Sequence, residues 1–374
     1  MKTYHNEKKW IWQSANFPKF VFEKVDLSQL YYKFGQLNMI EEFMDNDNSK
    51  ELVLDILSNE AIATSQIEGE ILQRSSVRSS VNKILKLGLD DDYSSTVHTD
   101  ALVDIIVDAK QNSSTALTKE RICRWHKALF PTGQSGIKEI NVGSYRTDIE
   151  DMQIVSGSWE KEKVHYVAPS STDVGNLMDY FLLWINSDTQ SNVIYKAAIA
   201  HLWFLLIHPY DDGNGRIARA ISDFVLSQGK LANTSFYSVS SIISSKRKEY
   251  YDVLDKVCVQ TDLEINVWIE WFIDLIFESI DDTLIKVETV KTKSIFWNKH
   301  QDTVLNERQK KVILKMLTSL PNEFEGGMKV KKYISITKTT RISASRDLSD
   351  LVSKGILQSH GKARGIYYTL ISNI

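Results

Sequence analysis

The chain has 374 residues, 43% of them hydrophobic and 25% charged, with a formal net charge of −3. This length exceeds what one hydrophobic core usually organises, so we expect two or three domains. The small net charge gives the whole molecule no electrostatic reason to bind nucleic acid or an anionic membrane. The longest apolar runs, Ala197–Ile207 and Trp268–Phe277, are too short to span a bilayer, and no signal peptide is visible. We therefore expect a cytoplasmic protein with no membrane partner.

Apolar residues recur at three- and four-residue spacing through most of the chain, which predicts a mainly α-helical fold. The predicted helices are Asp26–Met44, Lys50–Ile67, Ser75–Leu87, Val97–Ala109, Thr118–Leu129, Thr172–Ile185, Ile194–Ile207, Arg216–Leu226, Ser244–Val259 and Glu264–Glu288. A small β-hairpin is expected around Ile149–Val167, with its turn near Ser156–Gly157. The charged stretch Val287–Gln301 is expected to be a helical or extended link.

The C-terminal part of the chain differs from the rest in charge. From Leu305 to Ile374 there are 13 Lys or Arg against 5 Asp or Glu, a net of +8, which leaves −11 on the preceding residues. Its pattern predicts three helices and then two strands: Leu305–Leu317, Lys329–Ile334, Ser343–Lys354, Ile356–Ser359 and Ile366–Leu370. With the basic turn His360–Gly365, this is the order of a winged helix-turn-helix. We hypothesise that the tail binds DNA; docking to a protein or dimerisation is the alternative.

The segment His208–Arg219, with the sequence His-Pro-Tyr-Asp-Asp-Gly-Asn-Gly-Arg-Ile-Ala-Arg, concentrates residues suited to phosphate chemistry. Pro209 is expected to end the preceding apolar helix, and the glycines on either side of Asn214 predict a tight turn. The next helix then begins at about Gly215 or Arg216. Its unpaired N–H groups and positive dipole end favour an anion in that turn.

Four side chains of this segment have distinct predicted roles. Arg216 and Arg219 lie on one face of the helix and can together hold a polyphosphate by forked hydrogen bonds. Asp212 is a carboxylate beside the turn, suited to a Mg²⁺ that keeps several waters and bridges phosphates. His208 is the nearby group whose unperturbed pKa suits proton abstraction near pH 7. A zinc pair with His201 is not expected, because no third ligand follows the pattern.

The segment resembles the Fic motif, His-x-Phe-x-(Asp/Glu)-Gly-Asn-Gly-Arg-x-x-Arg, with Tyr210 in place of the phenylalanine. The resemblance implies a helical Fic core that transfers AMP from ATP, with Mg²⁺ on Asp212, to a Ser, Thr or Tyr hydroxyl of a target protein. It implies that the catalytic residues are His208, Asp212, Asn214 and Arg216. It implies that the nucleotide-binding residues are Glu68, Gly213, Asn214, Gly215, Arg216, Ile217, Ala218 and Arg219.

Two other segments resemble further parts of that family. Gly143–Arg146 followed by the Met152–Val167 hairpin is similar to the Fic flap, which holds the target segment by β-augmentation. Lys246–Leu254 is similar to the helix that borders the adenine pocket. Tyr251 on that helix is therefore assigned to the nucleotide, although Tyr250 and Tyr251 are each equally compatible with an ordinary core position.

The segment Thr64-Ser-Gln-Ile-Glu68-Gly69 resembles the inhibitory motif (Ser/Thr)-x-x-x-Glu-(Gly/Asn) of class II Fic proteins. We expect Ser58 to cap a helix whose last turn carries Glu68 and which Gly69 ends. Glu68 would have no partner on its own helix, so we expect it to pair with an arginine elsewhere, namely Arg219. The alternative is a surface glutamate before a capped helix end.

The predicted domains are a helical leader with the inhibitory helix over residues 1–95, a Fic catalytic core over 96–290, a linker over 291–304 and a winged helix over 305–374. The predicted function is that of a protein adenylyltransferase held inactive by Glu68. One rival is a DNA-binding regulator that senses nucleotide without transferring it. Another is a Fic enzyme that removes AMP or transfers a different phosphate-linked group. The sequence leaves a homodimer open.

Overall fold

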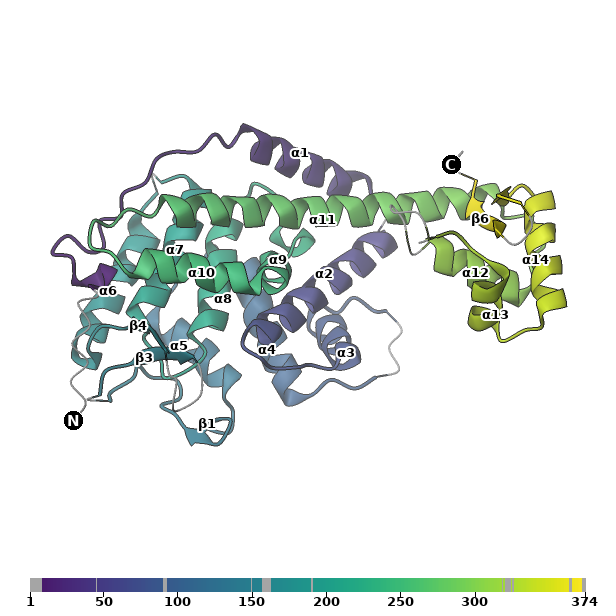
Figure 1. The fold of residues 1–374 in the computed structure, drawn as a ribbon. Coiled ribbons are helices and arrows are strands. Elements are labelled where there is room, and N and C mark those ends of the chain that lie inside the picture. Colours follow the sequence, from purple (N-terminus) through teal and green to yellow (C-terminus); the bar gives the residue numbers. More distant parts are fainter. Residues whose placement is uncertain are drawn as a thin grey trace. The chain divides into compact units, whose positions relative to one another are not determined.

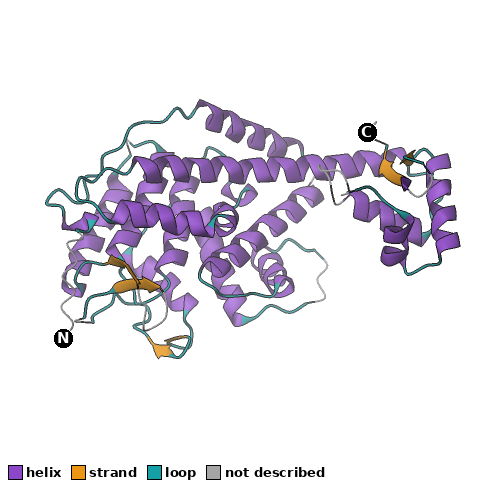
Figure 2. Cartoon of the chain, viewed as in Figure 1, coloured by secondary structure: helices purple, strands orange, loops and turns teal. Residues whose placement is uncertain are grey.

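The computed structural model describes residues 9–44, 46–89, 93–148, 150–156, 163–189, 191–317, 319, 324, 326–362 and 365–371. Helices dominate, and the described strands form two-stranded antiparallel sheets only (Figure 2). The predicted mainly α-helical class is therefore confirmed. The chain forms two compact units that divide between Asp281 and Asp282. Among the described residues, no helix combines the length and the apolar content that crossing a membrane requires.

Helices α1 to α10 of the first unit are labelled in Figure 1. Its helices are η1 Ile11–Gln13, α1 Ser28–Phe43, α2 Asn46–Ile67, α3 Arg74–Leu85, α4 Val97–Gln111, α5 Lys119–Leu129, α6 Ser171–Ser187, α7 Val193–Ile207, α8 Asn214–Gln228, η3 Thr234–Phe236, α9 Val239–Ser245 and α10 Arg247–Cys258. Helix α11, Asn266–Lys299, begins in the first unit and continues into the second.

Helix α7 is the hydrophobic centre of the first unit. Its sequence is mostly apolar, and Ala197, Leu202, Phe204 and Ile207 are fully buried, as is typical of a helix covered on every side. It packs against α8, whose inner positions are also buried. The segment that joins α7 to α8 carries the predicted site, so this rigid pair sets its position.

Two small hairpins accompany the helices of this unit. Strands β1, Gln134–Ser135, and β2, Lys138–Glu139, pair antiparallel, and neither was predicted. The predicted hairpin is present as β3, Gln153–Ser156, paired with β4, Lys163–Val167. Ile149 and residues 157–162, which include Gly157 of the predicted turn and Trp159, lie outside the described residues.

The second unit has the predicted order of three helices followed by a hairpin. Its elements are α12 Glu307–Leu317, α13 Val330–Thr337, α14 Arg341–Ser353, β5 Leu357–His360 and β6 Tyr367–Leu370. Apolar side chains from each helix meet in one small core, including Ile313, Tyr333 and Leu348. This core explains the periodicity of the tail. Residues 363–364 of the predicted wing, and residues 318, 320–323 and 325 between α12 and α13, lie outside the described part of the chain.

Three local predictions need correction. The helix predicted over Ser244–Val259 is two helices, α9 and α10, which meet at Lys246. Ser58 does not cap α2, because that helix already begins at Asn46 and the Ser58 hydroxyl donates to the Leu54 carbonyl. Helix α11 continues to Lys299, beyond the predicted end at Glu288, through most of the stretch Val287–Gln301 that was expected to be a helical or extended link. The four-part division of the chain stays a prediction.

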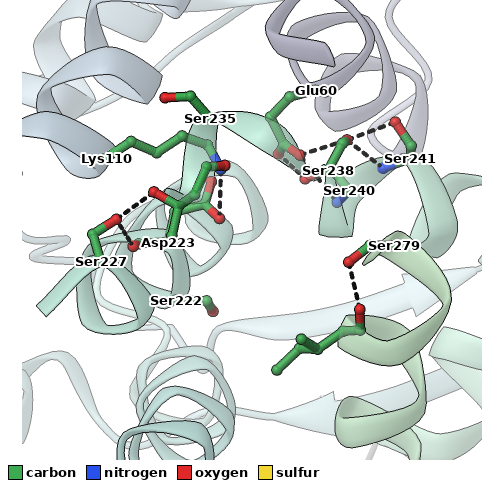
Figure 3. A network of polar contacts seen from close by, with 12 residues as sticks. Glu60, Lys110, Ser222, Asp223, Ser227, Ser235, Ser238, Ser240, Ser241 and Ser279 are labelled. Carbon is green, nitrogen blue, oxygen red and sulfur yellow. Dashed lines mark hydrogen bonds and ion pairs between the residues drawn. The ribbon is translucent and has the colours of Figure 1, made fainter. Parts of the chain in front are cut away.

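Buried polar groups tie α2 to the core of the first unit (Figure 3). The carboxylate of Glu60 on α2 is 2% exposed and accepts hydrogen bonds from the Ser238 hydroxyl (2.7 Å), the Ser240 N–H (3.2 Å) and the Ser240 hydroxyl. These donors lie at the beginning of α9, where a helix favours negative charge. The middle of α2 is therefore fixed to α9 about two helical turns before Glu68.

A second part of the same network is an ion pair between Lys110 on α4 and Asp223 on α8, with 3.1 Å between Nζ and Oδ1. The two side chains are 1% and 5% exposed. We predict that Asp223→Leu lowers the free energy of unfolding by about 3–5 kcal/mol, because it leaves the Lys110 charge buried without its partner. Urea denaturation measures this loss. The double variant Lys110→Met/Asp223→Leu should recover most of it, and equal losses in both variants would contradict the prediction.

Candidate active site

His208 lies directly after α7 in a left-handed backbone conformation, with φ at +51°. Arg146, which is 3% exposed, holds this segment from outside the helix. Its Nε donates to the His208 carbonyl at 2.8 Å, and its backbone N–H donates to the Pro209 carbonyl at 2.9 Å. Surrounding contacts of this kind are what keep a non-glycine residue in a sparsely populated conformation. Arg146 was predicted only as part of the segment that precedes the flap hairpin. Its hydrogen bonds to the His208 segment were not predicted.

The imidazole of His208 is arranged as a proton acceptor. Its Nδ1 lies 3.2 Å from the carbonyl oxygen of Leu205, and a carbonyl can only accept, so Nδ1 carries the proton. Nε2 is then left with its lone pair. Burial lowers the pKa of His208 to about 4, so the ring is neutral at pH 7. Nε2 has no hydrogen-bond partner among the described residues and can accept a proton, although a pKa of about 4 makes the ring a weaker base than a histidine of ordinary pKa.

The loop between α7 and α8 is closed by Asn214. Its Oδ1 accepts from the Tyr210 N–H at 3.0 Å, and its Nδ2 donates to the Tyr210 carbonyl at 2.8 Å. Asn214 is 2% exposed, so in this structure it positions the turn. Gly213 has φ at +81°, and a Cβ there would lie 2.8 Å from the ring of Phe130. Only glycine meets both conditions easily.

His126 on α5 supports the same loop. Its Nε2 donates to the Asp212 carbonyl at 3.1 Å, while its Nδ1 accepts from the Gly143 N–H at 3.0 Å. The ring stacks on Tyr210 with 4.0 Å between centroids. The Tyr210 hydroxyl, which the usual phenylalanine lacks, lies 3.5 Å from the sulfur of Cys123. Burial lowers the pKa of His126 to about 4, which keeps it neutral in this supporting role.

The carboxylate of Asp212 lies beside the turn, as predicted. It accepts hydrogen bonds from the Gly213 N–H at 2.5 Å and from the Ser135 hydroxyl on β1. Within the described part of the chain, no three His, Cys, Asp or Glu residues are grouped to hold a metal ion. One carboxylate fits Mg²⁺ only when phosphates and water supply the other ligands. The residues present therefore suit a magnesium ion that arrives with a nucleotide.

Helix α8 begins at Asn214, and its first turn faces the end of α2. A Cβ added at Gly215 would collide with the carboxylate of Glu68, so this carboxylate lies against the start of α8. Oε1 of Glu68 is 2.7 Å from Nη2 of Arg219. Arg219 also donates to the hydroxyl (2.7 Å) and the carbonyl (3.0 Å) of Thr64. The expected Glu68–Arg219 pair is present, and a carboxylate occupies a helix start that favours anions.

Arg216, the other predicted phosphate ligand, also meets a carboxylate. Its Nη1 lies 3.3 Å from Oε2 of Glu70, and Nε2 of His98 on α4 lies 2.6 Å from Oε1 of the same glutamate. The sequence analysis identified neither Glu70 nor His98. Glu70 lies one residue beyond the inhibitory motif, and His98 has no patterned neighbours, so no local signal marked them.

Other predicted nucleotide-binding residues have different surroundings. Ile217 and Ala218 bury their side chains fully, and the Ile217 N–H donates to the Gly213 carbonyl, so their assignment rests on resemblance alone. The Tyr251 side chain is partly exposed, and its hydroxyl lies 3.4 Å from the carbonyl of Ile67. Tyr251 thus contacts the end of α2, and its predicted contact with adenine stays a prediction.

Two more predictions concern the surroundings of α7. His201 is fully buried, with its ring nitrogens 2.8 Å from the Ser222 hydroxyl and 3.1 Å from the Tyr250 hydroxyl, which makes it a satisfied core histidine. The β3–β4 hairpin is held to α7 because the Tyr166 hydroxyl donates to the Leu206 carbonyl at 2.6 Å. The hairpin is therefore fixed within two residues of His208.

This geometry defines a class of protein. It is a helical domain in which one short loop carries a histidine and leads into a helix start that favours anions. Residues 116–226 match the Fic/DOC family, and residues 10–87 match a domain of unknown function, DUF4172. The first match contains the whole segment His208–Arg219 and the second contains Glu68 and Glu70. The similarity to the Fic/DOC family therefore covers residues 116–226 of the chain.

Individual relatives agree with this assignment. A probable protein adenylyltransferase of Aquifex aeolicus (strain VF5) is 25% identical over 169 residues, 44% of this chain and 48% of that protein. The protein adenylyltransferase Fic of Aedes aegypti is 28% identical over 133 residues, 34% of this chain and 25% of that protein. The chain spans about half or less of the length of these curated relatives.

One solved structure shows how far the likeness in fold extends. The crystal structure of a Fic family protein from Desulfovibrio desulfuricans G20 is similar over 94% of this chain and 98% of that chain, with a TM-score of 0.51. The two sequences are 16% identical, so the likeness concerns the fold alone. This likeness supports a Fic fold with additional helices before and after the domain in the sequence.

Proposed function

We propose that this protein transfers AMP from ATP to a hydroxyl side chain of a target protein, and that Glu68 holds it inactive. The observation that carries the proposal is the start of α8, where the Glu68 carboxylate and Arg219 form the contact that a phosphate would make. His208 lies on the same loop as a neutral base. The names of the Aquifex aeolicus and Aedes aegypti relatives support adenylyl transfer over other phosphate chemistry.

The reaction follows from these groups. The phosphates of ATP bind at the start of α8 with Arg216 and Arg219, while Nε2 of His208 accepts the proton of the target hydroxyl. The hydroxyl oxygen forms a bond to the α-phosphorus, and the bond from that phosphorus to the bridging oxygen of pyrophosphate breaks. Pyrophosphate leaves with the electron pair, and AMP stays on the target. Asp212 would hold Mg²⁺, which neutralises phosphate charge.

The β3–β4 hairpin is the part proposed to hold the target. An extended segment can add to an exposed sheet edge by main-chain hydrogen bonds, which leaves its side chains free to face the site. The bond from Tyr166 to the Leu206 carbonyl fixes this hairpin beside the end of α7. A target hydroxyl on such a segment would be presented to His208, which is the positioning that transfer requires.

The test uses ATP that is labelled either at the α-phosphate or at the γ-phosphate, with the Glu68→Gly variant and a cell lysate as the source of targets. Label from the α-phosphate alone should appear on protein. Label from the γ-phosphate would indicate phosphate transfer instead. Removal of AMP from pre-labelled protein, without any addition, would favour the rival enzyme. Nucleotide binding without labelling in any variant would favour the nucleotide-sensing regulator.

We further propose that the second unit binds duplex DNA through α14. The exposed positions of this helix include Arg341, Ser345, Arg346 and Ser349. Its acidic residues are engaged elsewhere: Asp347 is 4% exposed and pairs with Arg308, and Asp350 pairs with Lys354. The exposed face therefore presents positive charge and hydroxyls, as a recognition helix does. Arg364 in the predicted wing lies outside the described residues.

We predict that the variant Arg341→Ala/Arg346→Ala of the full chain binds a mixed-sequence duplex less tightly and with a shallower salt dependence. Loss of two phosphate contacts reduces the slope of log affinity against log salt by about two. Fluorescence anisotropy between low and moderate salt measures both quantities. The control is Lys286→Ala/Lys291→Ala on α11, which removes the same charge. Equal binding by wild type and the α14 variant, or no binding at low salt, would refute DNA binding.

A further inference from the structure

We infer that Glu70 is a second inhibitory carboxylate, which competes with the phosphates of ATP for Arg216. The inference rests on the proposed use of Arg216 as a phosphate ligand. It extends the inhibition beyond the motif Thr64–Gly69, because the two arginines of the site are each held by a different glutamate. The nucleotide must then displace two carboxylates to bind productively.

The surroundings of Arg216 make the contact with Glu70 important. The Arg216 side chain is 8% exposed, so water replaces a lost partner poorly. Its guanidinium lies 5.0 Å from the ring centre of Phe130, which covers it without accepting a strong hydrogen bond. Within the described residues, Nε of Arg216 and Nη1 of Arg219 are buried without a hydrogen-bond partner. The site therefore holds more donors than the two glutamates use, which suits a ligand richer in acceptors, such as a polyphosphate.

The turn after α2 explains how two carboxylates reach one site. The N–H groups of Glu68 and Glu70 both donate to the carbonyl of Ser65, at 3.1 and 3.0 Å. Gly69 lies between them with φ at +86°, a conformation that glycine adopts at little cost. This tight helix end projects Glu68 to Arg219 and Glu70 to Arg216. The sequence Glu-Gly-Glu at the end of α2 thus directs both carboxylates to the two arginines of the site.

His98 contacts Glu70 from the other side, by a close N–O approach in which Nε2 makes no hydrogen bond to the described residues. It lies in the first turn of α4, and its Nε2 is 2.6 Å from Oε1 of Glu70, while Oε2 of Glu70 faces Arg216. These neighbours, with His98 foremost, hold the pKa of Glu70 below its usual range. Glu70 therefore stays ionised at neutral pH and keeps the charge with which it competes against phosphate.

The contact of Glu70 with Arg216 is weaker than that of Glu68 with Arg219. The distances are 3.3 and 2.7 Å, and the glutamate side chains are 35% and 27% exposed. Breaking the contact of Glu68 with Arg219 is therefore the larger energetic step. The effect of Glu70 on ATP affinity is expected to become measurable once Glu68 has been replaced. The measurable consequence is a change in affinity for phosphates, and not in affinity for the nucleoside.

The experiment compares Glu68→Gly with Glu68→Gly/Glu70→Gln by calorimetric titration with ATP and with adenosine. We expect the double variant to bind ATP roughly threefold to tenfold more tightly, as release of a half-buried ion pair allows. Adenosine affinity should not change. Glu68→Gly/His98→Gln should move ATP affinity in the same direction by a smaller factor. Glu68→Gly/Glu51→Gln is the matched control, since Glu51 on α2 pairs with Arg78.

Equal ATP affinity in Glu68→Gly and Glu68→Gly/Glu70→Gln would overturn the inference, as would an equal gain for adenosine. If Glu70→Gln lowered the melting temperature strongly, Glu68→Gly/His98→Gln would decide, because it leaves Glu70 in place. Binding is measured without transfer, so failure of the proposed function has a separate signature. In that case no variant adds labelled AMP to protein, whatever its ATP affinity.

Discussion

Replacement of Glu68 by glycine is expected to raise self-labelling from α-phosphate-labelled ATP by about tenfold or more over wild type. The reason lies at the start of α8, where the Glu68 carboxylate is 2.7 Å from Arg219 and lies against Gly215. A phosphate that binds there meets a negative charge and an occupied guanidinium. ATP can still bind by its other contacts, but with its α-phosphate out of line with His208. A misplacement of about 1 Å can cost a hundredfold in rate.

The required energy is modest. A tenfold shift between blocked and open arrangements corresponds to about 1.4 kcal/mol, within reach of one partly buried charge pair. Glu68→Gln is the matched variant, because it keeps the size of the side chain and removes its charge, so it should activate less than glycine. Arg219→Ala should not activate, since it removes the inhibitory contact and a phosphate ligand together. If Glu68→Gly labels itself no more than wild type, Thr64–Gly69 is only a helix end.

Features encoded by neighbouring residues could be predicted from the sequence. The apolar run that forms α7 and the turn from His208 to Gly215 depend on spacing within a few residues. The same holds for the Glu68 motif, whose partner was expected because Arg219 lies in the segment that resembles the Fic motif. Helix periodicity also predicted α12, α13 and α14 of the tail, because their apolar side chains meet in one small core.

The contacts that complete the site could not be predicted, because they join residues far apart in the chain. Arg216 and Glu70 are separated by 146 positions, and Arg146 and the His208 carbonyl by 62. No periodicity encodes such pairs. The capping prediction for Ser58 failed for another reason. A serine hydroxyl suits a helix cap, but a serine can also lie inside a helix. The apolar pattern continues upstream of it, so α2 begins at Asn46 and the cap is not needed.

Replacement of His208 is expected to cause the largest loss of activity. In the Glu68→Gly background, where labelling is measurable, His208→Asn should lower the rate of AMP transfer by about 10²–10⁴-fold. ATP affinity should change little, because in the proposed reaction Nε2 of His208 accepts the proton of the target and does not bind a phosphate. Single-turnover labelling measures the rate, and calorimetric titration with ATP measures binding.

Asparagine is a better replacement for His208 than alanine because of the backbone conformation at this position. His208 has φ at +51°, a conformation that costs alanine about 1–2 kcal/mol and that asparagine adopts more readily. Alanine would therefore mix the loss of a base with displacement of the loop that carries Asp212, whereas asparagine keeps the loop. Equal losses in His208→Asn and His208→Ala, with ATP binding intact, would assign the effect to the missing imidazole. Transfer by His208→Asn at the parent rate would show that another group accepts the proton. It would also contradict a catalytic role for the Leu205 carbonyl in orienting the ring.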